Sequence, residues 1–458
     1  MTEKGRTDVR EISLEALLLI LEEGTLSHLV IAKALKKYQY LDKRERAFFT
    51  RLTEGTLERV ITLDYVLSAC ASIPARKMKP VIRMILRMGA YQLLYMDSVP
   101  DSAACNEAVR LARKKGFRNL TGFVNGVLRT IAREKEKLLE KLCDPSQTDL
   151  SVRYSTPEWM VEEWKKAYGV EVTEKLLKAS LEERKTTVRC CLDKASGEEI
   201  VELLKKEQVE GKLCVWPSYA LELSGYDYLE GLPSFQEGYF VVQDISSMMV
   251  AEAAGIRQGF QIIDVCAAPG GKSLHVAEKL RGTGYVEARD LTEYKIGLLE
   301  ENIARTGLSN IRACLWDAAK YDSTWEQRAD VVLADLPCSG LGVIGKKNDL
   351  KYRITNKDLE ELAALQRELL TTVSRYVKPG GCLIYSTCTI NPGENQENVA
   401  WMLSHLPFEM ESLLDYLPEE LINSLTTEQR KDAKEGSLTF LPGINPCDGF
   451  FLARLRRR

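Results

Sequence analysis

Hydrophobic residues in the first third of the chain recur every three or four positions, the spacing of one buried helix face. Leu14, Leu17 and Leu21 follow Ser13, which we expect to be an N-cap. The spacing recurs around Ile85 and over residues 103–131, and β-branched alternation is nearly absent. Residues 1–140 are therefore predicted to form an all-helical bundle.

The pattern changes between residues 141 and 156, where Asp144-Pro145-Ser146 indicates a linker. Thr156-Pro157-Glu158 is a typical helix start and predicts helices over 157–168 and near 171–183. A small α+β domain over residues 150–240 is completed by a strand over 186–192, a helix over 197–207 and a strand over 213–216.

From residue 260 onward, expected strands and helices alternate regularly. The strands are apolar throughout, as in a parallel sheet covered on both faces: 260–265, 284–289, 310–315, 330–334 and 382–386. Helices are expected to begin near Ser273, Thr292, Lys357 and Glu394, and a hairpin over 437–455 to join the sheet edge. Residues 241–458 are thus predicted to form a Rossmann-like α/β domain with its ligand at the carboxyl ends of the strands.

Composition limits the classes of function. The chain has 458 residues, of which 45% are hydrophobic, too many for a disordered chain. The longest wholly apolar run, Ala16–Leu21, is far below the roughly 18 residues of a membrane span. A secretory signal pattern is also missing, so we expect a cytoplasmic protein without a membrane partner.

Twelve cysteines raise the question of a metal site. No two are spaced C-x-x-C, and the only histidines are His28, His275 and His405. We therefore expect no metal and mostly reduced thiols, of which one or two could be nucleophiles.

Charge is unevenly distributed along the chain. The net charge is −3, but residues 1–140 carry +8 and the remainder −11. A basic first third suits a polyanion partner, although solvated helix faces would explain it equally well. Within it, the loop 113–119 holds four cations and Phe117, a composition suited to phosphate contacts.

Acidic residues at the ends of four successive predicted strands indicate a nucleoside-containing ligand. Asp290 is placed to bond ribose hydroxyls, Asp317 lies near an adenine position, and Asp264 and Asp335 end the strands on either side. The first strand breaks into a small-residue loop before a helix N-terminus, which favours an anionic group. The loop matches neither the dinucleotide nor the triphosphate pattern, so S-adenosylmethionine is predicted, with this loop in contact: Cys266, Ala267, Ala268, Pro269, Gly270, Gly271 and Lys272.

Two cysteines follow the fourth and fifth predicted strands. Cys338 lies in Pro337-Cys338-Ser339-Gly340 and Cys388 in Ser386-Thr387-Cys388-Thr389, so both face the same crevice. Carbon 5 of a pyrimidine is too weak a nucleophile to take a methyl group unless a thiolate first adds to carbon 6. Two thiols at this edge fit that chemistry, one as the nucleophile and one assisting proton removal from carbon 5. Asp335 is placed to hydrogen-bond the ring nitrogen.

Three segments, residues 266–273, 335–342 and 386–398, resemble the motifs of RNA cytosine-5 methyltransferases of the RsmB/NOP (Sun/Fmu) family. The resemblance implies that Cys388 is the nucleophile and that Cys338 assists product release. It also carries the cofactor positions over to the 266–272 loop, Asp290, Asp317 and Asp335. In DNA cytosine-5 methyltransferases the nucleophile comes from the Pro-Cys motif instead, so Cys388 favours RNA.

The resemblance extends along nearly the whole chain. Residues 99–101, 106–109 and 123–129 resemble the NusB family of RNA-binding proteins, and residues 154–159 and 243–247 resemble the middle region of the same methyltransferases. The implied protein has a NusB-like RNA-binding domain (1–140), an α+β RNA-binding domain (150–240) and a methyltransferase domain with a mostly parallel seven-stranded sheet (241–458).

The implied activity is methylation of carbon 5 of a cytidine in 16S rRNA, free or in early small-subunit assembly, by a monomer. The resembled enzyme acts on cytosine 967. Two alternatives stay open: the same chemistry on tRNA or another rRNA site, and a NusB-like adapter with a vestigial methyltransferase. The chain departs from many relatives at Lys346-Lys347-Asn348-Asp349, where they carry an arginine pair, and in its basic tail, which we expect to be a solvated end.

Overall fold

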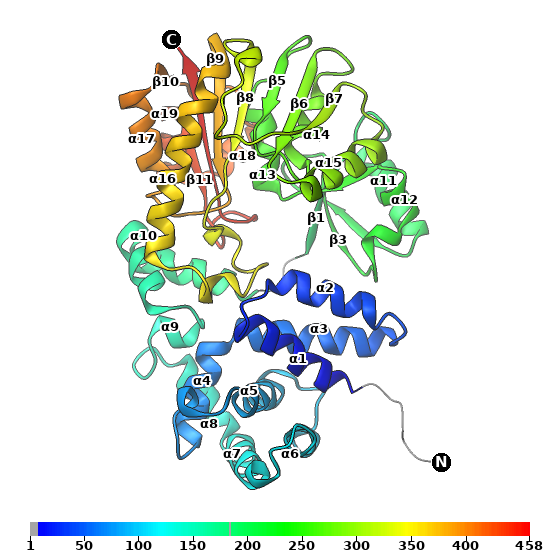
Figure 1. The fold of residues 1–458 in the computed structure, drawn as a ribbon, viewed down its shortest axis with the longest axis vertical. Helices are drawn as coiled ribbons and strands as arrows, with labels where there is room; N and C mark the ends of the chain where they lie inside the picture. Colours follow the sequence, from blue (N-terminus) through cyan, green and yellow to red (C-terminus); the bar gives the residue numbers. More distant parts are fainter. Residues whose placement is uncertain (1–7, 183–184) are drawn as a thin grey trace. The chain divides into compact units, whose positions relative to one another are not determined.

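The computed structural model describes residues 8–182 and 185–458, which form two compact units (Figure 1). The first unit comprises Met1–Glu182 and, from much later in the chain, Ile344–Arg353. The second comprises Glu183–Val343 and Ile354–Arg458.

The first unit is helical, as predicted. Its elements are α1 (Val9–Leu21), α2 (Ser27–Lys37), α3 (Lys43–Glu58), α4 (Val60–Cys70), η1 (Ala75–Lys77), α5 (Pro80–Tyr95), α6 (Asp101–Lys114), η2 (Arg118–Leu120), α7 (Thr121–Arg133), α8 (Lys135–Cys143), α9 (Leu150–Arg153), α10 (Glu158–Ala179) and η6 (Leu350–Tyr352).

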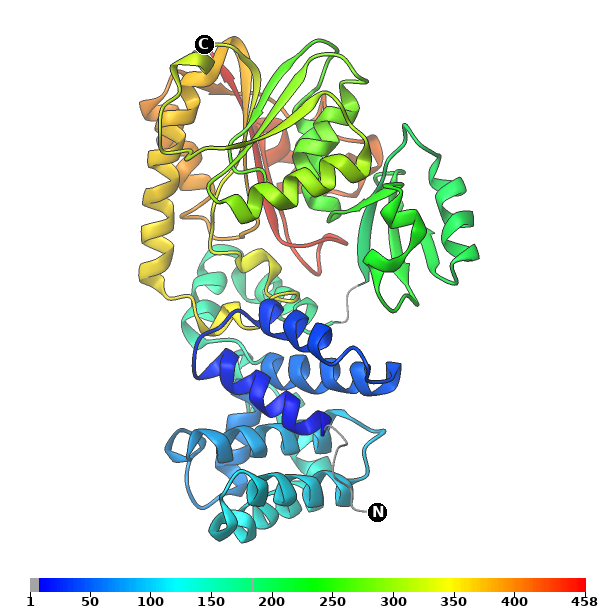
Figure 2. The same cartoon turned by 45° about the vertical axis from the view of Figure 1, so that its right-hand side comes forward.

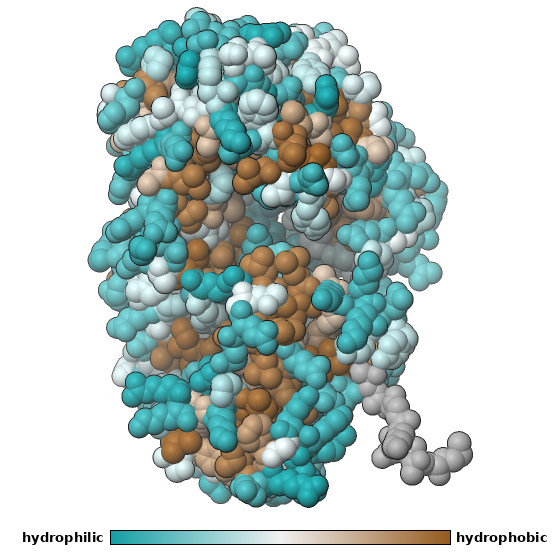
Figure 3. Space-filling model, in the orientation of Figure 1, coloured by the Kyte–Doolittle hydropathy of each residue, from teal (hydrophilic) through white to brown (hydrophobic). Residues whose placement is uncertain are grey.

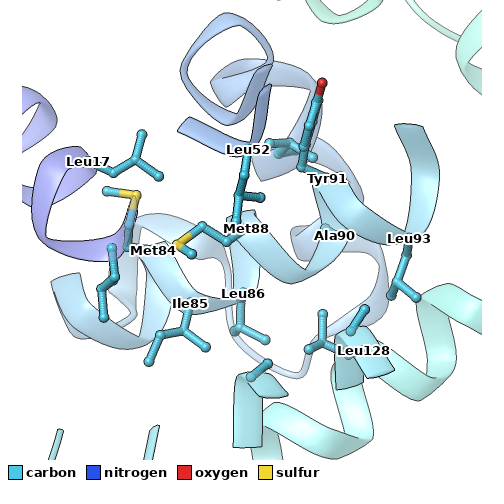
Figure 4. Close-up of a cluster of buried hydrophobic side chains, with 14 of the residues drawn as sticks. Leu17, Leu52, Met84, Ile85, Leu86, Met88, Ala90, Tyr91, Leu93 and Leu128 are labelled. Carbon is cyan, nitrogen blue, oxygen red and sulfur yellow. The ribbon is translucent and has the colours of Figure 1, made fainter. Parts of the chain in front are cut away.

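Helix α5 is the core of this unit. It buries residues on every side, as a helix that is apolar all round must. Leu17 of α1, Leu52 of α3 and Leu128 of α7 lie around it (Figure 4). A Cβ at Gly89 would lie 2.7 Å from the side chain of Leu128, so this glycine is what lets α7 approach so closely.

The second unit begins with a small antiparallel sheet in the strand order β2-β3-β1-β4. Its elements are β1 (Thr186–Cys190), α11 (Gly197–Lys206), β2 (Glu210–Leu213), β3 (Ala220–Ser224), η3 (Leu229–Gly231), α12 (Pro233–Gln236) and β4 (Phe240–Val242). The strand expected over 213–216 was wrong beyond Leu213, because the chain turns there into β3.

The large sheet has the order β10-β12-β9-β8-β5-β6-β7, with β11 also paired to β12. Its elements are α13 (Ile245–Ala253), β5 (Gln261–Asp264), α14 (Gly271–Lys279), β6 (Tyr285–Asp290), α15 (Glu293–Thr306), β7 (Ile311–Leu315), η4 (Ser323–Trp325), β8 (Ala329–Asp335), η5 (Leu341–Val343), α16 (Asn356–Val373), η7 (Ser374–Tyr376), β9 (Val377–Thr387), α17 (Gln396–His405), β10 (Phe408–Met410), α18 (Glu419–Ser424), α19 (Thr427–Glu435), β11 (Ser437–Phe440) and β12 (Phe450–Arg457).

The strands from β9 to β7 are parallel, whereas β12 is antiparallel to its neighbours. The described sheet thus has eight strands rather than the expected seven. Ile262 packs with α13 and α14 on one face, and Ile263 packs with α16 on the other. Helices cover both faces of this sheet (Figure 2). Burial on both faces explains why the central strand β8 is apolar, whereas the edge strand β7 exposes Arg312 and Leu315.

Two further local expectations need correction. Ser13 does not cap α1, because the helix begins at Val9 with Asp8 as its N-cap and the Ser13 hydroxyl donates back to the carbonyl of Val9. The basic tail is only in part a solvated end, because Arg456 and Arg458 are exposed but Arg454 is buried. It forms part of β12, where the buried Arg454 donates to Glu411 and to the carbonyl of Ala253.

Hydrophilic residues cover most of the face in Figure 3, and hydrophobic ones reach the surface in separate patches. Within the described ranges, no helix is both long enough and apolar enough to cross a membrane.

Candidate active site

The predicted site residues lie at the carboxyl ends of neighbouring strands. Because β5, β6, β7 and β8 are parallel, the residues that end or follow them share one edge of the sheet. Asp290 and Asp335 are the last residues of β6 and β8, and Asp317 follows β7. The Asp317 carboxylate accepts from Ala319 N–H at 3.0 Å, within its own turn.

The loop after β5 is tied to Asp290. Its residue Ala268 donates its N–H to Asp290 Oδ2 at 3.0 Å, while Lys295 Nζ lies 2.9 Å from Oδ1. Gly270 has a φ of 111°, a left-handed conformation that glycine adopts without strain, and it caps the N-terminus of α14. The loop therefore presents the open N-terminal end of a helix beside a buried carboxylate.

Asp264, at the end of β5, is fully buried beneath this loop. Its Oδ2 accepts from the Ser273 hydroxyl at 2.5 Å, and Oδ1 has no hydrogen-bond partner in the described chain. Burial raises the pKa of Asp264 to about 7.

Lys272 and Asp335 form an ion pair across the crevice. Lys272 Nζ lies 2.8 Å from Asp335 Oδ2, and the Ser386 hydroxyl donates to Oδ1 at 2.8 Å. Burial alone would lower the pKa of Lys272, but the negative charge of Asp335 outweighs it and raises that pKa. Lys272 also lies over the ring of Phe450, 5.3 Å from its centroid.

The structure brings Cys338 and Cys388 together. Their Sγ atoms are 3.3 Å apart, and both cysteines are partly exposed. The hydrogen bond with Cys388, together with burial, raises the pKa of Cys338 well above its usual value, so Cys338 stays a protonated thiol. Cys266 lies in the loop after β5, where burial raises the pKa of its thiol too.

The loops carrying these cysteines are packed tightly. Gly342 N–H donates to the carbonyl of Cys388 at 3.0 Å, and Gly449 N–H donates to the carbonyl of Gly342 at 2.9 Å. A Cβ at Gly342 would lie 2.0 Å from the Gly449 carbonyl oxygen, so only glycine fits there. The contacts of Phe450 and Gly449 were not expected from the sequence, because they depend on β12 pairing beside β9. The Ser386 hydroxyl reaches Asp335 because the two residues are opposite each other in the pairing of β8 with β9.

Elsewhere, the structure separates the cations of the loop 113–119 into two kinds. Lys114 and Lys115 pair with Glu11, whereas Arg113 and Arg118 are exposed and have no ion pair among the described residues. The segment 346–349, where the sequence differs from many relatives, lies in the first unit. There Asp349 accepts hydrogen bonds from Ser27.

Comparisons with known proteins agree with this architecture. Residues 254–456 match the family model described as 16S rRNA methyltransferase RsmB/F, residues 7–133 match the NusB family, and residues 156–226 match the RsmF/B-like ferredoxin-like domain. The probable ribosomal RNA small subunit methyltransferase B of Bacillus subtilis (strain 168) is 37% identical over 456 residues, which is 99% of both chains. The chain belongs to this methyltransferase family.

Further relatives cover the same length. The ribosomal RNA small subunit methyltransferase B of Proteus mirabilis is 30% identical over 91% of this chain and 96% of its own. The crystal structure of PH0851 superposes with a TM-score of 0.79 at 25% identity, covering 99% of this chain and 100% of its own. NSun6 from Pyrococcus horikoshii with SFG, at 24% identity, shares the fold over 66% of this chain and 98% of its own, with a TM-score of 0.58.

The methyl donor of the family is S-adenosylmethionine, and the residues at the strand ends fit it. The open N-terminus of α14 suits its carboxylate, and Asp290 offers acceptors for ribose hydroxyls. Asp264 Oδ1, buried and without a partner in the described chain, offers one more acceptor beneath the loop. When bound, the cofactor supplies a methyl group from its sulfonium.

Proposed function

We propose that this enzyme methylates carbon 5 of a cytidine in 16S rRNA, with Cys388 as nucleophile and Cys338 as release residue. The observation that carries the proposal is the pair of sulfur atoms 3.3 Å apart at the ends of β8 and β9. Carbons 5 and 6 of cytosine are adjacent, so the two groups that act on them must also be neighbours.

The Cys388 thiolate adds to carbon 6, and the electron pair of the 5,6 double bond moves toward the ring nitrogen. Carbon 5 is then an enamine carbon and bonds to the methyl group. A base removes the remaining proton from carbon 5, and that C–H electron pair restores the double bond and expels Cys388. Because Cys338 is protonated and cannot itself take this proton, we propose that it holds the water molecule that does, beside Cys388.

The Lys272–Asp335 pair assists the addition step. With Oδ1 and Oδ2 held by Ser386 and Lys272, the Asp335 carboxyl has a fixed direction. We propose that Lys272 supplies the proton that neutralises the charge developing on the ring nitrogen, and that the protonated nitrogen then donates to the Asp335 carboxylate.

Two cysteine variants test these roles. Cys388→Ala should abolish methylation and form no adduct, because the nucleophile is gone. Cys338→Ala should accumulate a covalent RNA–protein adduct, seen as a shifted band on a denaturing gel. Cys314→Ala is the matched control, since Cys314 lies on β7, which β5 and β6 separate from β8. Free turnover by Cys338→Ala would contradict the assignment.

The substrate is proposed from relatives named as rRNA small subunit methyltransferases. Bisulfite sequencing of total RNA from a deletion strain should show one unmodified 16S rRNA cytidine, and cytosine 967 is the position expected from the resemblance. Loss at a tRNA or another rRNA position would favour the first alternative. Failure to bind S-adenosylmethionine in calorimetry would favour the adapter.

The remaining parts of the proposal concern RNA binding. We propose that the NusB-like domain (1–140) and the middle domain (150–240) hold the RNA, and that a monomer acts in the cytoplasm, where ribosomal RNA is made. Whether naked RNA or an assembling subunit is the better substrate would follow from comparing the methylation rates of the two.

A further inference from the structure

The side chain of Glu394 is a buried carboxylate between the two cysteine loops. It is 0% exposed and lies in the segment that connects β9 to α17. Oε2 accepts from Ser339 N–H at 2.8 Å and from Gln366 Nε2 at 3.0 Å. Oε1 accepts from the Ser339 hydroxyl at 2.5 Å and from Asn391 Nδ2 at 3.1 Å.

All four of these donors are neutral groups. A buried carboxylate is costly unless its oxygens are hydrogen-bonded, and a carboxylate can only accept. Hydrogen bonds to a charged group are stronger than bonds between neutral groups, so each bond helps to fix its donor in place. Glu394 therefore holds the groups around it more tightly than a neutral side chain could.

The donors lie next to the two cysteines in the sequence. Ser339 directly follows Cys338, and Gln366 also donates to the carbonyl of Pro337, at 2.8 Å. Both neighbours of Cys338 are thus fixed, one directly by Glu394 and one through Gln366.

The same carboxylate reaches the loop of Cys388. Asn391 lies three residues after this cysteine and donates to Oε1. Ser339 Oγ is also 2.8 Å from the hydroxyl of Thr389, the residue after Cys388. Since Ser339 must donate its proton to Glu394, Thr389 is the donor in this second bond, and the hydroxyls form a directed chain across the loops.

The side chain of Glu394 does not serve the helix that follows it. Helix α17 begins at Gln396, and its N-cap is Asn395, without a side-chain hydrogen bond to the helix. Tyr385 and Asn398 contact the backbone carbonyl of Glu394, not its carboxylate. The hydrogen bonds of the carboxylate therefore all go to the two cysteine loops and to Gln366.

We propose that Glu394 is a positioning residue that sets the spacing of the two cysteine sulfurs. The inference rests on the proposed function, because the spacing matters if one thiol adds to carbon 6 while the other acts at carbon 5. A misplacement of about 1 Å can reduce such a rate about 100-fold.

Glu394→Gln tests this with little change in volume. The amide nitrogen would replace an acceptor where two donors converge, so the loops must shift or turn their donors away. We expect kcat to fall 10- to 100-fold, with KM for RNA and Kd for S-adenosylmethionine within twofold of wild type. Glu397→Gln, at an exposed position in α17, is the matched control and should match wild type in every measurement.

A measurement without substrate separates this inference from the proposed function. In the protein without RNA or cofactor, a diazenedicarboxamide oxidant takes two electrons and two protons from Cys338 and Cys388 and leaves a disulfide. Mass spectrometry of tryptic peptides should show this crosslink forming at least fivefold more slowly in Glu394→Gln than in wild type. The result does not depend on whether the enzyme modifies cytidine.

Ser339→Ala covers the case in which Glu394→Gln fails to fold, because it removes the hydroxyl chain and keeps the backbone bond. It should slow both crosslinking and turnover by a smaller factor. An unchanged crosslinking rate in a folded Glu394→Gln, or a drop in kcat with unchanged crosslinking in both variants, would overturn the proposal. If crosslinking is slower in the variants as expected but the wild type methylates no cytidine, only the proposed function would be overturned.

Discussion

At the scale of single residues, the Lys272–Asp335 pair is the charged centre of the site. The side chains are 15% and 25% exposed, so each ion depends on the other more than on water. Removing one member of such a pair leaves an uncompensated charge, which costs more than removing both.

Asp335→Asn should therefore lower the free energy of unfolding by about 2 kcal/mol, allowing for partial exposure. It should also reduce methylation at least 100-fold, as loss of a proton-handling group does. Urea unfolding and single-turnover methylation measure the two effects. The double variant Lys272→Met/Asp335→Asn should regain stability but not activity; a double variant less stable than Asp335→Asn would contradict the pairing.

The acids at the strand ends could be predicted from the sequence, because parallel strands bring their carboxyl ends to one edge whatever the loops do. Asp290, Asp335, Cys338 and Cys388 all lie at that edge. Glu394 could not be predicted in the same way. Its partners come from the β8 loop, α16 and the β9 loop, and no local pattern marks a glutamate whose donors are 3 to 55 residues away.

At the scale of elements, α14 carries a buried histidine against the small sheet. The ring of His275 lies 5.3 Å from that of Tyr219, and its Nε2 is 4.0 Å from Glu252. Burial, with the positive charges of Arg189 and Lys279, lowers the pKa of His275 well below 6.5.

The sign of the resulting pH dependence follows from proton binding. Below pH 6.5 the unfolded chain binds a proton that the folded His275 excludes, so this contribution is present above pH 6.5 and lost as the pH falls. Asp264 has the opposite effect. Its folded pKa of about 7 lies above its ordinary 3.8, so its contribution to the free energy of unfolding is lost as the pH rises from 3.8 to about 7. In a plot of wild-type stability against pH, these two opposite effects would partly cancel.

His275→Phe isolates the histidine. The difference in free energy of unfolding, wild type minus variant, should fall by about 1.4 kcal/mol per pH unit between pH 6 and 5. Urea unfolding at several pH values measures this difference. A difference that does not change with pH would show that the folded His275 titrates with its ordinary pKa and would contradict the prediction.

The loops at one end of α5 and α6 form a basic surface. The segment before α5 carries exposed Arg76, Lys77 and Lys79, and Lys79 Nζ lies 5.5 Å from the ring centre of Phe117 in the loop after α6. With Arg113 and Arg118, this surface has five exposed cations without an ion pair among the described residues.

Replacing Lys77, Lys79 and Arg118 by glutamine should weaken RNA binding and flatten its salt dependence. Each lost phosphate contact should reduce the slope of log K against log salt by about 0.7 to 0.9. Lys114→Gln/Lys115→Gln is the matched control, since these lysines already pair with acids of α1. Filter binding at several salt concentrations decides; equal slopes in the triple variant and the control would contradict an RNA contact here.

The ends of strands could be predicted from the sequence where burial in the core requires a run of apolar residues. The parallel strands β5, β6, β7 and β8 lie within one residue of the predicted ranges, whereas β9 begins at Val377, before the expected residue 382. The three-residue strand β10 gave no such run, and Ser13 was misread because a serine in a helix interior can bond a carbonyl four residues earlier.

At the scale of the whole molecule, the chain crosses between its two units more than once. The segment Ile344–Arg353 follows the Cys338 loop in sequence and yet packs in the first unit. There, Lys351 is buried and donates to the carbonyl of Glu58 at the end of α3, at 2.9 Å. Contacts this distant in sequence have no local signature in the sequence. The domain boundaries expected from the sequence pattern stay a prediction.

Helix α2 shows what this segment does for the first unit. Its N-cap, Leu26, has no side chain that can accept a hydrogen bond. Asp349 takes that role from 322 residues away, accepting from Ser27 N–H at 3.2 Å and from the Ser27 hydroxyl. Loss of a capping acceptor typically costs about 1 kcal/mol.

Asp349→Ala should therefore speed amide hydrogen exchange in the first turn of α2 about fivefold, because opening of that turn becomes about 1 kcal/mol easier. Exchange in β5, β8 and β9 of the second unit should not change. Asp358→Ala is the matched control: Asp358 belongs to the capping box of α16, so its loss should speed exchange in α16 and leave α2 untouched. Unchanged exchange in α2 of Asp349→Ala would mean that the late segment does not stabilise the helix it caps.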